Sequence, residues 1–293
     1  MKRLSAGLAI VLVLILISIY VFIPGSVKIS ESVTADCNPE SASRIISEKK
    51  FWEKYQYLLS GVYYHKVTLQ QRNGKMKNSL MIIPIAFTDS IRLNWTCGVA
   101  TGQLPWERVR RYQEAKAIRE RVQQTLLSIG GYLSNRVNVY GIDIKDDMSR
   151  DSTLIATKWT GPAYPGTEEI YDRIHSLRAY ASSQGAHEMD YPMMHVECLA
   201  DGHFETMVAL PVDKYLKGNG TIFPKRFVPY KILLGIVHGG AASAEQGMVR
   251  LALFTSENHR TGMAIPFQSL VTERDKEPDT LKWVTHVILP VNG

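Results

Sequence analysis

The chain has 293 residues, a net charge of +6 and 45% hydrophobic residues, which excludes a largely disordered protein and fits one large or two ordinary domains. The charge is modest, and no basic run with interleaved aromatic residues argues for nucleic acid as a partner. Cys37, Cys97 and Cys198 lie far apart, without a CxxC pair or a Cys/His spacing. The sequence therefore predicts neither a metal site nor a disulfide framework.

An apolar run at the N-terminus is the most specific local signal. Residues 4–23 contain no charged side chain, and about 20 helical residues cross a hydrocarbon core. Lys2 and Arg3 precede the run while only Lys28 follows closely, which places the N-terminus in the cytoplasm. Because no small-x-small cleavage pattern follows, we interpret residues 1–25 as an uncleaved anchor rather than a signal peptide. The sequence thus predicts a single-pass protein of a bacterial inner membrane, with membrane lipid as a partner and periplasmic domains.

The next segment, residues 26–138, is expected to form one domain. Helices are predicted over residues 38–56, with Asn38 or Ser41 as the N-cap, and over residues 105–134, where apolar residues recur at helical spacing. Together with its "FWEKY" helix, the segment resembles the START-like, polyketide-cyclase superfamily, which implies a reduced helix-grip domain. Whether it holds a ligand cavity or serves as a spacer or docking module stays open. Strands are predicted over residues 27–34, 62–70, 79–87 and 90–101, with a hairpin turn at Asn73-Gly74.

Residues 152–212 and 230–291 repeat one order of elements: strand, helix, strand, strand. Each copy ends in Leu-Pro-Val, and each helix is followed by a glycine, Gly185 or Gly262, that can act as its C′ cap. Because independent elements recur in the same order, the sequence predicts a duplicated β-α-β-β unit. A plain loop is expected between the copies, over residues 217–226. The elements are predicted over residues 152–162, 167–185, 191–199 and 204–212, and again over 230–240, 243–262, 265–273 and 282–291.

Two such units commonly combine into one antiparallel sheet with both helices on one face and a cleft between the units. The predicted fold class is therefore α+β. The endings "MVALPV" and "HVILPV", with "HGG" after the fifth strand, resemble the GyrI-like family, also called the bacterial transcription-activator effector-binding domain, over residues 139–293. The resemblance implies that small, often cationic or aromatic, molecules bind in the cleft. Some members of the family sense effectors for transcription, and some hydrolyse reactive small molecules.

The resemblance also implies an acidic residue on the third strand of the second copy. Aligned on Pro266, that position is occupied by Gln268, which can orient a ligand by hydrogen bonds but cannot neutralise a cation or act as a base. Glu197 and Glu273 are the carboxylates that could replace it. His195 shares a strand face with Glu197, and this pair is predicted either to line the cleft or to lie on an exposed strand face.

Aromatic side chains stand where a cleft could use them for flat or cationic ligands. Core packing is the alternative for each of them. His238 and His286 are accompanied by no Ser or Cys nucleophile motif, so no catalytic residue is predicted. The aromatic candidates are Trp159, Tyr164, Tyr191, Phe267 and Trp283.

These features together predict a membrane-anchored protein that binds a cationic, aromatic or lipophilic small molecule without catalysis and without a cofactor. One alternative is a hydrolase of reactive lipophilic compounds, in which Glu197 or Glu273 acts as the base. Another is a cell-envelope scaffold that holds an unidentified protein partner. No DNA-binding helix-turn-helix precedes the cleft domain, so nucleic acid is not expected as a partner.

Overall fold

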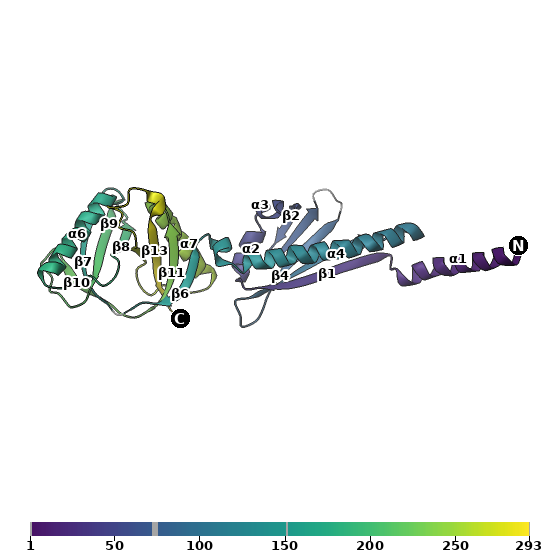
Figure 1. The fold of residues 1–293 in the computed structure, drawn as a ribbon, viewed down its shortest axis with the longest axis horizontal. Helices are drawn as coiled ribbons and strands as arrows, with labels where there is room; N and C mark the ends of the chain where they lie inside the picture. Colours follow the sequence, from purple (N-terminus) through teal and green to yellow (C-terminus); the bar gives the residue numbers. More distant parts are fainter. Residues whose placement is uncertain (1, 72–75, 151, 293) are drawn as a thin grey trace. The chain divides into compact units, whose positions relative to one another are not determined.

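The computed structural model describes residues 2–71, 76–150 and 152–292, and residues 2–9 by their backbone alone. The chain forms two compact units, Met1–Asn135 and Arg136–Gly293. In the first unit a five-stranded antiparallel sheet has the order β1-β5-β4-β3-β2, and α4 runs along β1 (Figure 1). Its elements are α1 (Lys2–Phe22), β1 (Ser26–Ala35), α2 (Pro39–Ile46), α3 (Lys49–Glu53), β2 (Tyr57–Tyr63), β3 (Lys66–Gln71), β4 (Lys77–Pro84), β5 (Ile91–Ala100) and α4 (Pro105–Leu133).

Two predictions for this unit need correction. The helix expected over residues 38–56 is interrupted after Ile46, because the buried Trp52 indole donates to the Ile46 carbonyl (2.6 Å) and Glu48 is extended. The strand expected over residues 62–70 is a hairpin, since the chain reverses at Tyr64, which adopts a positive φ of 45°. The Asn73-Gly74 turn lies outside the described residues. The Asn38 cap is confirmed, because its side chain accepts from the Glu40 amide.

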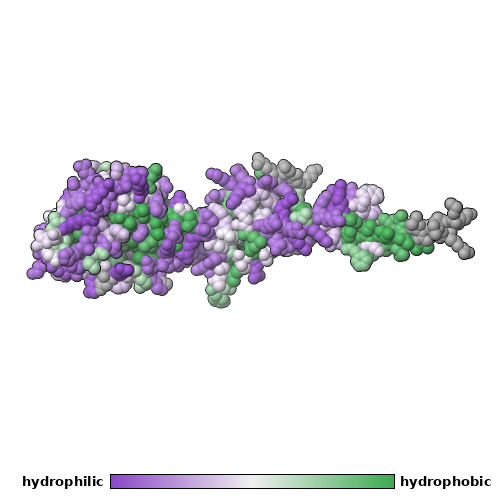
Figure 2. All heavy atoms as spheres, in the orientation of Figure 1, coloured by the Kyte–Doolittle hydropathy of each residue, from purple (hydrophilic) through white to green (hydrophobic). Residues whose placement is uncertain are grey.

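The N-terminal helix α1 covers the segment predicted to be a membrane anchor. Its described side chains, residues 10–22, are apolar apart from Ser18 and the Tyr20 hydroxyl, and they are mostly exposed (Figure 2). Within the described part of the chain, no helix combines the length and apolarity needed to cross a membrane. The prediction of a single-pass protein in a bacterial inner membrane, with a lipid partner and periplasmic domains, is thereby contradicted.

The second unit is built on one eight-stranded antiparallel sheet with the order β10-β7-β9-β8-β12-β13-β11-β6. Figure 1 shows β9 beside β8 and β13 beside β11, with β12 pairing between β8 and β13, and α6 and α7 cover the sheet. The mixed α+β fold expected for this half is confirmed. Its elements are α5 (Arg136–Tyr140), β6 (Asp143–Met148), β7 (Ser152–Gly161), α6 (Thr167–Ser183), β8 (Met193–Cys198), β9 (Phe204–Val212), β10 (Phe223–Phe227), β11 (Lys231–His238), α7 (Ala241–Glu257), β12 (Phe267–Leu270) and β13 (Val284–Val291), with a short 3-10 helix at Thr280–Lys282.

The repeat extends further than the sequence indicates. Helix α7 begins and ends 74 residues after α6, from 167 to 241 and from 183 to 257. The Pro211 carbonyl accepts from the Met189 amide (3.0 Å), just as the Pro290 carbonyl accepts from the Met263 amide (2.9 Å). Both copies also begin with an additional strand, β6 or β10. We call β6–β9 module 1 and β10–β13 module 2.

The two additional strands are exchanged between the modules. β6 precedes β7 in the chain but pairs with β11 of module 2, and β10 precedes β11 but pairs with β7 of module 1. The two pairings have the same register. Met148 of β6 lies opposite Lys231 of β11, and Arg226 of β10, 78 residues after Met148, lies opposite Thr153 of β7, 78 residues before Lys231. The segment predicted as a plain loop between the copies therefore ends in an edge strand of the sheet.

Both helices cover the same face of the sheet. Helix α6 packs on Ile155, Met194 and Leu270 through one cluster of buried apolar side chains, and α7 approaches Val287, which lies opposite Gln268 on β12. The helix C-termini differ from the prediction in one respect. Gly185 (φ 65°) follows α6 as expected, but the left-handed residue after α7 is His259 (φ 52°) rather than Gly262.

Candidate ligand-binding sites at the junction of the modules

The two modules meet where β8 pairs with β12. Gln268 lies opposite Met194, and Ser269 lies opposite Met193. Since Gln268 follows Met194 by the same 74 residues that separate the two helices, the pseudo-two-fold axis of the repeat passes through this pair. Each side chain on either strand faces one of the two sides of the sheet, so this junction has a helix-covered face and a helix-free face.

On the helix-covered face, Gln268 is almost fully buried (6% exposed). Its Nε2 donates to the hydroxyl of Tyr164 (3.4 Å), which belongs to the loop between β7 and α6. That loop is longer than its counterpart in module 2, where Gly239 and Gly240 alone join β11 to α7. Burial raises the pKa of Tyr164. The Oε1 atom of Gln268 is buried without a hydrogen-bond partner.

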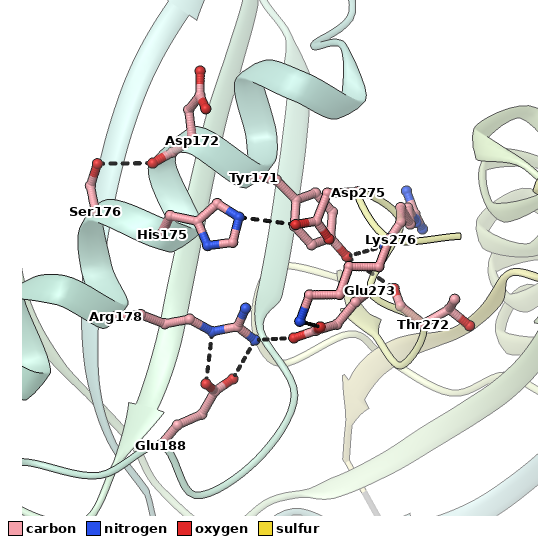
Figure 3. A network of polar contacts seen from close by, with 11 residues as sticks. Tyr171, Asp172, His175, Ser176, Arg178, Glu188, Thr272, Glu273, Asp275 and Lys276 are labelled. Atoms are coloured by element: carbon pink, nitrogen blue, oxygen red, sulfur yellow. Dashed lines mark hydrogen bonds and ion pairs between the residues drawn. The ribbon is translucent and has the colours of Figure 1, made fainter. Parts of the chain in front are cut away.

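The loop between β12 and β13, residues 271–283, is fastened to α6 along one face of that helix (Figure 3). The Tyr171 hydroxyl donates to the Thr272 carbonyl (2.9 Å) and accepts from the Arg274 amide (2.9 Å). His175 contacts the Asp275 carboxylate (3.0 Å). These residues lie one helical turn apart, so a module 1 helix holds a module 2 loop in place.

Arg178 completes this fastening. Its guanidinium donates to both carboxylate oxygens of Glu188 (2.8 and 3.0 Å) and pairs with Glu273 (3.0 Å). Lys276 also pairs with Glu273, and these cations hold the pKa of the Glu273 carboxyl below its usual value, with the Lys276 hydrogen bond as the largest cause. Glu273 is thus engaged at the rim of the loop, as Figure 3 shows, and does not replace the carboxylate absent at Gln268.

Arg274, between these anchored acids, turns inward and is 5% exposed. Its Nη2 donates to the Thr285 hydroxyl (2.8 Å), and its guanidinium lies 4.9 Å from the centre of the Trp283 ring. Its Nε is buried without a partner. Burial lowers the pKa of Arg274, opposed by the hydroxyls of Tyr171 and Tyr164. Thr285 lies opposite Leu270 on β12, so Arg274 shares the helix-covered face with Gln268.

The helix-free face of the junction carries a pocket of about 240 Å³, which we call the junction pocket. It spans strands of both modules, and the edge strand β10 forms one wall. Phe267 is buried and packs edge-on against Phe227, with 5.4 Å between the ring centres, and both rings belong to the pocket lining. The pocket is mostly apolar, and its charged lining residues, Lys225 and Arg226, are both cationic. It is lined by Leu154, Met193, Met194, His195, Met207, Ala209, Lys225, Arg226, Phe227, Val228, Tyr230, Ala264, Ile265 and Phe267.

The residues predicted for a single cleft are therefore divided among different places. Gln268, Tyr164 and Trp283 lie together on the helix-covered face. Trp159 lies on that face too, packed against the α6 core with Arg173 over its ring (5.4 Å). On the helix-free face, Phe267 and His195 line the junction pocket, and the His195 Nδ1 contacts the Pro266 carbonyl (2.7 Å).

Two predicted residues belong to neither face of the junction. Glu197 is exposed near the end of β8, opposite Glu205 of β9, and Tyr191 is 45% exposed. His195 and Glu197 share a strand face, as predicted, but the strand carries Glu197 beyond the pocket. The carboxylates considered for a hydrolase, Glu197 and Glu273, are thus both at the protein surface.

Sequence reasoning missed Arg274 and the methionines of the junction pocket. Arg274 lies in "TERDKEPD", which reads as a solvated charged loop, and nothing in that run of letters marks the arginine as buried. Met193 and Met207 could have been found by alternation, because each faces away from the helix-packing residues of its own strand. Their pocket also needs β10, which was predicted as loop.

Comparison with known proteins gives similarity of fold only. No family model matches the chain, and no curated protein matches it. Among solved structures, EcmrR in a DNA complex is similar at 14% identity and a TM-score of 0.48, over 64% of this chain and 71% of that one. A hydrolase from Listeria innocua is similar at 12% identity and a TM-score of 0.40, over 51% of this chain and 92% of that one. SAV2435 bound to tetraphenylphosphonium is similar at 14% identity and a TM-score of 0.34, over 52% of this chain and 94% of that one.

None of these TM-scores reaches 0.5, so no ligand or activity is transferred from them to this chain. The expectation that nucleic acid is not a partner is not upheld by this comparison, since EcmrR was solved in a complex with DNA, but that partner is EcmrR's and is not assigned to this chain. The START-like resemblance of the N-terminal segment gains no support from these similarities.

Proposed function

We propose that residues 139–293 form a GyrI-like, effector-binding domain that binds a small lipophilic molecule in the junction pocket without catalysing a reaction. The observation that supports this proposal is the pocket itself: about 240 Å³, largely apolar, and built from strands of both modules. Ligand pockets are typically concave, apolar and lined by a few polar groups that orient the ligand. Here Met193, Met207 and Phe267 supply the apolar wall, and His195 and Tyr230 supply polar atoms at its edge.

The charge of the lining sets the ligand class. Lys225 and Arg226 are the charged side chains that line the pocket, and no carboxylate accompanies them among its lining residues. A cationic ligand would meet like charge as it leaves water, whereas a neutral or anionic one would not. The cationic ligand implied by the family resemblance is therefore disfavoured in this pocket, and a neutral or anionic lipophilic molecule is favoured.

Binding without catalysis is favoured by the positions of the two candidate bases. Glu197 is exposed outside the pocket, and Glu273 is held by Arg178 and Lys276. A general base must reach the proton that it removes, directly or through one water. Neither carboxylate is placed to do so for a molecule in the junction pocket.

A fluorescence titration tests the proposal. N-phenyl-1-naphthylamine, a neutral dye that brightens in apolar surroundings, is titrated into the full chain and into Ala264→Trp, which puts a bulky side chain at a lining position of the pocket. Ala252→Trp is the matched control, because Ala252 is exposed on α7, which covers the other face of the sheet. We expect Ala264→Trp to weaken binding about tenfold or more and Ala252→Trp to leave it unchanged. Equal binding by all three proteins would overturn the proposal.

A further inference from the structure

A buried arginine without an acidic partner lies on the helix-covered face of the junction. Arg274 is 5% exposed, and the titratable groups that act on it within the described chain are the hydroxyls of Tyr171 and Tyr164. The carboxylates on either side of it in the sequence are engaged elsewhere, Glu273 with Arg178 and Lys276 and Asp275 with His175. The guanidinium charge is therefore desolvated without being paired.

Such a charge is costly to bury, because pairing normally offsets desolvation. The contacts of Arg274 satisfy it in part: Thr285 accepts from Nη2, and the Trp283 ring faces the guanidinium. Nε remains buried with no acceptor. The N–H at Nε and one N–H of a neighbouring nitrogen form the fork that binds two oxygens of a carboxylate.

A second polar atom on the helix-covered face of the junction also lacks a hydrogen-bond partner. Gln268 Oε1 is buried and unbonded, while Gln268 Nε2 contacts the Tyr164 hydroxyl at 3.4 Å. Turning the amide by 180° lets Oε1 accept from that hydroxyl and frees Nε2 as a donor, since the two ends of an amide are equivalent in shape. Besides the larger effect of burial, the charge of Arg274 lowers the pKa of the Tyr164 hydroxyl and that of Glu245, an exposed carboxylate of α7, raises it, so this hydroxyl lies within electrostatic reach of Arg274.

We infer that Arg274 and Gln268 form a second ligand site, which binds the carboxylate of a small organic acid on the helix-covered face of the junction. The anion would accept from Arg274 Nε and from the Gln268 amide, with Tyr164 and Trp283 beside it. This site lies across the sheet from the junction pocket and does not depend on it. At position 268 the family resemblance implies a carboxylate that binds cations, whereas this chain has the neutral Gln268 with the Arg274 cation close by.

Three planar probes of the same shape and different charge test the inference: benzoate, benzamide and benzamidine. Isothermal titration and thermal unfolding are followed on the full chain. We expect benzoate at millimolar concentration to bind and to raise Tm, and benzamide and benzamidine to do neither. Arg274→Met should weaken benzoate binding about tenfold or more, while its Tm without ligand is unchanged or raised because an unpaired buried charge is removed.

Arg173→Met is the matched control, since Arg173 also lies over a tryptophan on the same sheet face (5.4 Å from the Trp159 ring centre) but is partly exposed. It should bind benzoate like the wild type. If Arg274→Met does not fold, Gln268→Glu provides the second test, because a carboxylate at that position repels the ligand. Equal binding of benzoate and benzamide, or no binding of benzoate, would overturn the inference.

The junction pocket is tested separately in the same experiment. Ala264→Trp should keep benzoate binding while losing N-phenyl-1-naphthylamine binding, and Arg274→Met should do the reverse. If benzoate binding is lost in Ala264→Trp and kept in Arg274→Met, the anion occupies the junction pocket and the second site is refuted. Failure of either site therefore leaves the other one standing.

Discussion

Gln268 of β12 lies directly opposite Met194 of β8, at the equivalent position of the other module. The repeat thus places a polar amide and an apolar thioether on either side of its own axis, both facing the helices. An exactly symmetric protein would bury two identical side chains there. The asymmetry instead gives one module the hydrogen-bonding group and the other the apolar wall, and the loop carrying Tyr164 reaches the amide from module 1.

Gln268→Glu is expected to convert the Arg274 site into an internal ion pair. The new carboxylate would take the place of a bound anion, so benzoate affinity should fall about tenfold or more. Because pairing would depress the pKa of the new carboxyl, its stabilising effect should be complete at neutral pH and lost as the pH falls through that depressed pKa. Isothermal titration and urea unfolding measure the two effects. Gln268→Met, which removes the amide without adding charge, should weaken benzoate less; an equal loss in both variants would contradict the ion-pair account.

Lys225→Met is expected to distinguish the contribution of charge to ligand binding in the junction pocket from the contribution of apolar contacts. Lys225 lines the pocket, and its Nζ lies 3.2 Å from the Met207 sulfur. The substitution should weaken binding of 8-anilinonaphthalene-1-sulfonate severalfold through loss of an exposed charge contact. Binding of neutral N-phenyl-1-naphthylamine, which has the same ring system, should stay unchanged. Parallel losses for both dyes would indicate damage to the pocket rather than loss of charge.

Arg178 is expected to stabilise the fold by tying α6 to the β12–β13 loop. Its side chain is 24% exposed and that of Glu273 is 36% exposed, so solvent weakens the pair. A coupling of about 0.5–1 kcal/mol is therefore expected between them. A double-mutant cycle with Arg178→Met and Glu273→Gln, measured by urea unfolding, gives this value. A coupling near zero would mean that the loop is held by Tyr171 and His175 alone.

Gly247→Ala is expected to destabilise the protein although alanine is the better helix former. A Cβ at Gly247 would lie 2.5 Å from the Val237 side chain, so α7 would have to move away from β11. A loss of about 1–3 kcal/mol is expected. Gly131→Ala in α4 is the control, because a Cβ there meets nothing within 4 Å and should stabilise by about 0.5–1 kcal/mol. Differential scanning calorimetry should show Tm shifts of opposite sign; a gain for Gly247→Ala would show that the helix yields freely.

His286 is expected to make stability fall in mild acid. Burial lowers the pKa of His286 below its usual value of 6.5, with a smaller opposing effect of Asp190 and a reinforcing effect of Lys145. The unfolded chain therefore takes up a proton before the folded one does. The contribution of neutral His286 to the free energy of unfolding is complete above its usual pKa, and it is lost as the pH falls through the lowered pKa of the folded protein. Urea unfolding of the wild type and His286→Gln at about pH 7.5 and about pH 5 should show a smaller pH effect in the variant; equal effects would assign the dependence to other groups.

The repeat could be predicted because its strands and helices are written in long apolar patterns with glycine and proline at matching places. The two edge strands could not, because "DIKDDM" and "FPKRF" are short and polar and become strands only by bonding to β11 and β7. Edge strands commonly carry such charged side chains. Local pattern therefore predicted the centre of the sheet and missed its edges.

The candidate site was harder to predict for a different reason. Alternation correctly placed Met194 against the helices and His195 on the other face, but it could not assign the two faces of β12. Phe267 and Gln268 were expected to line one cleft and instead face opposite sides of the sheet. Arg274 is buried because Tyr171, His175 and Arg178 hold its neighbours from a helix about a hundred residues earlier. No local pattern encodes that contact.

The exchange of β6 and β10 gives the C-terminal unit the connectivity of a strand-swapped homodimer whose two chains have been joined through residues 213–222. A single module would lack the strand that covers its own outer edge, and two copies would have to trade strands to complete the sheet. Gene duplication and fusion of such a dimer would preserve the exchange while freeing the two halves to diverge. On such an origin, Met194 and Gln268 would occupy equivalent positions beside the axis that once related the two chains.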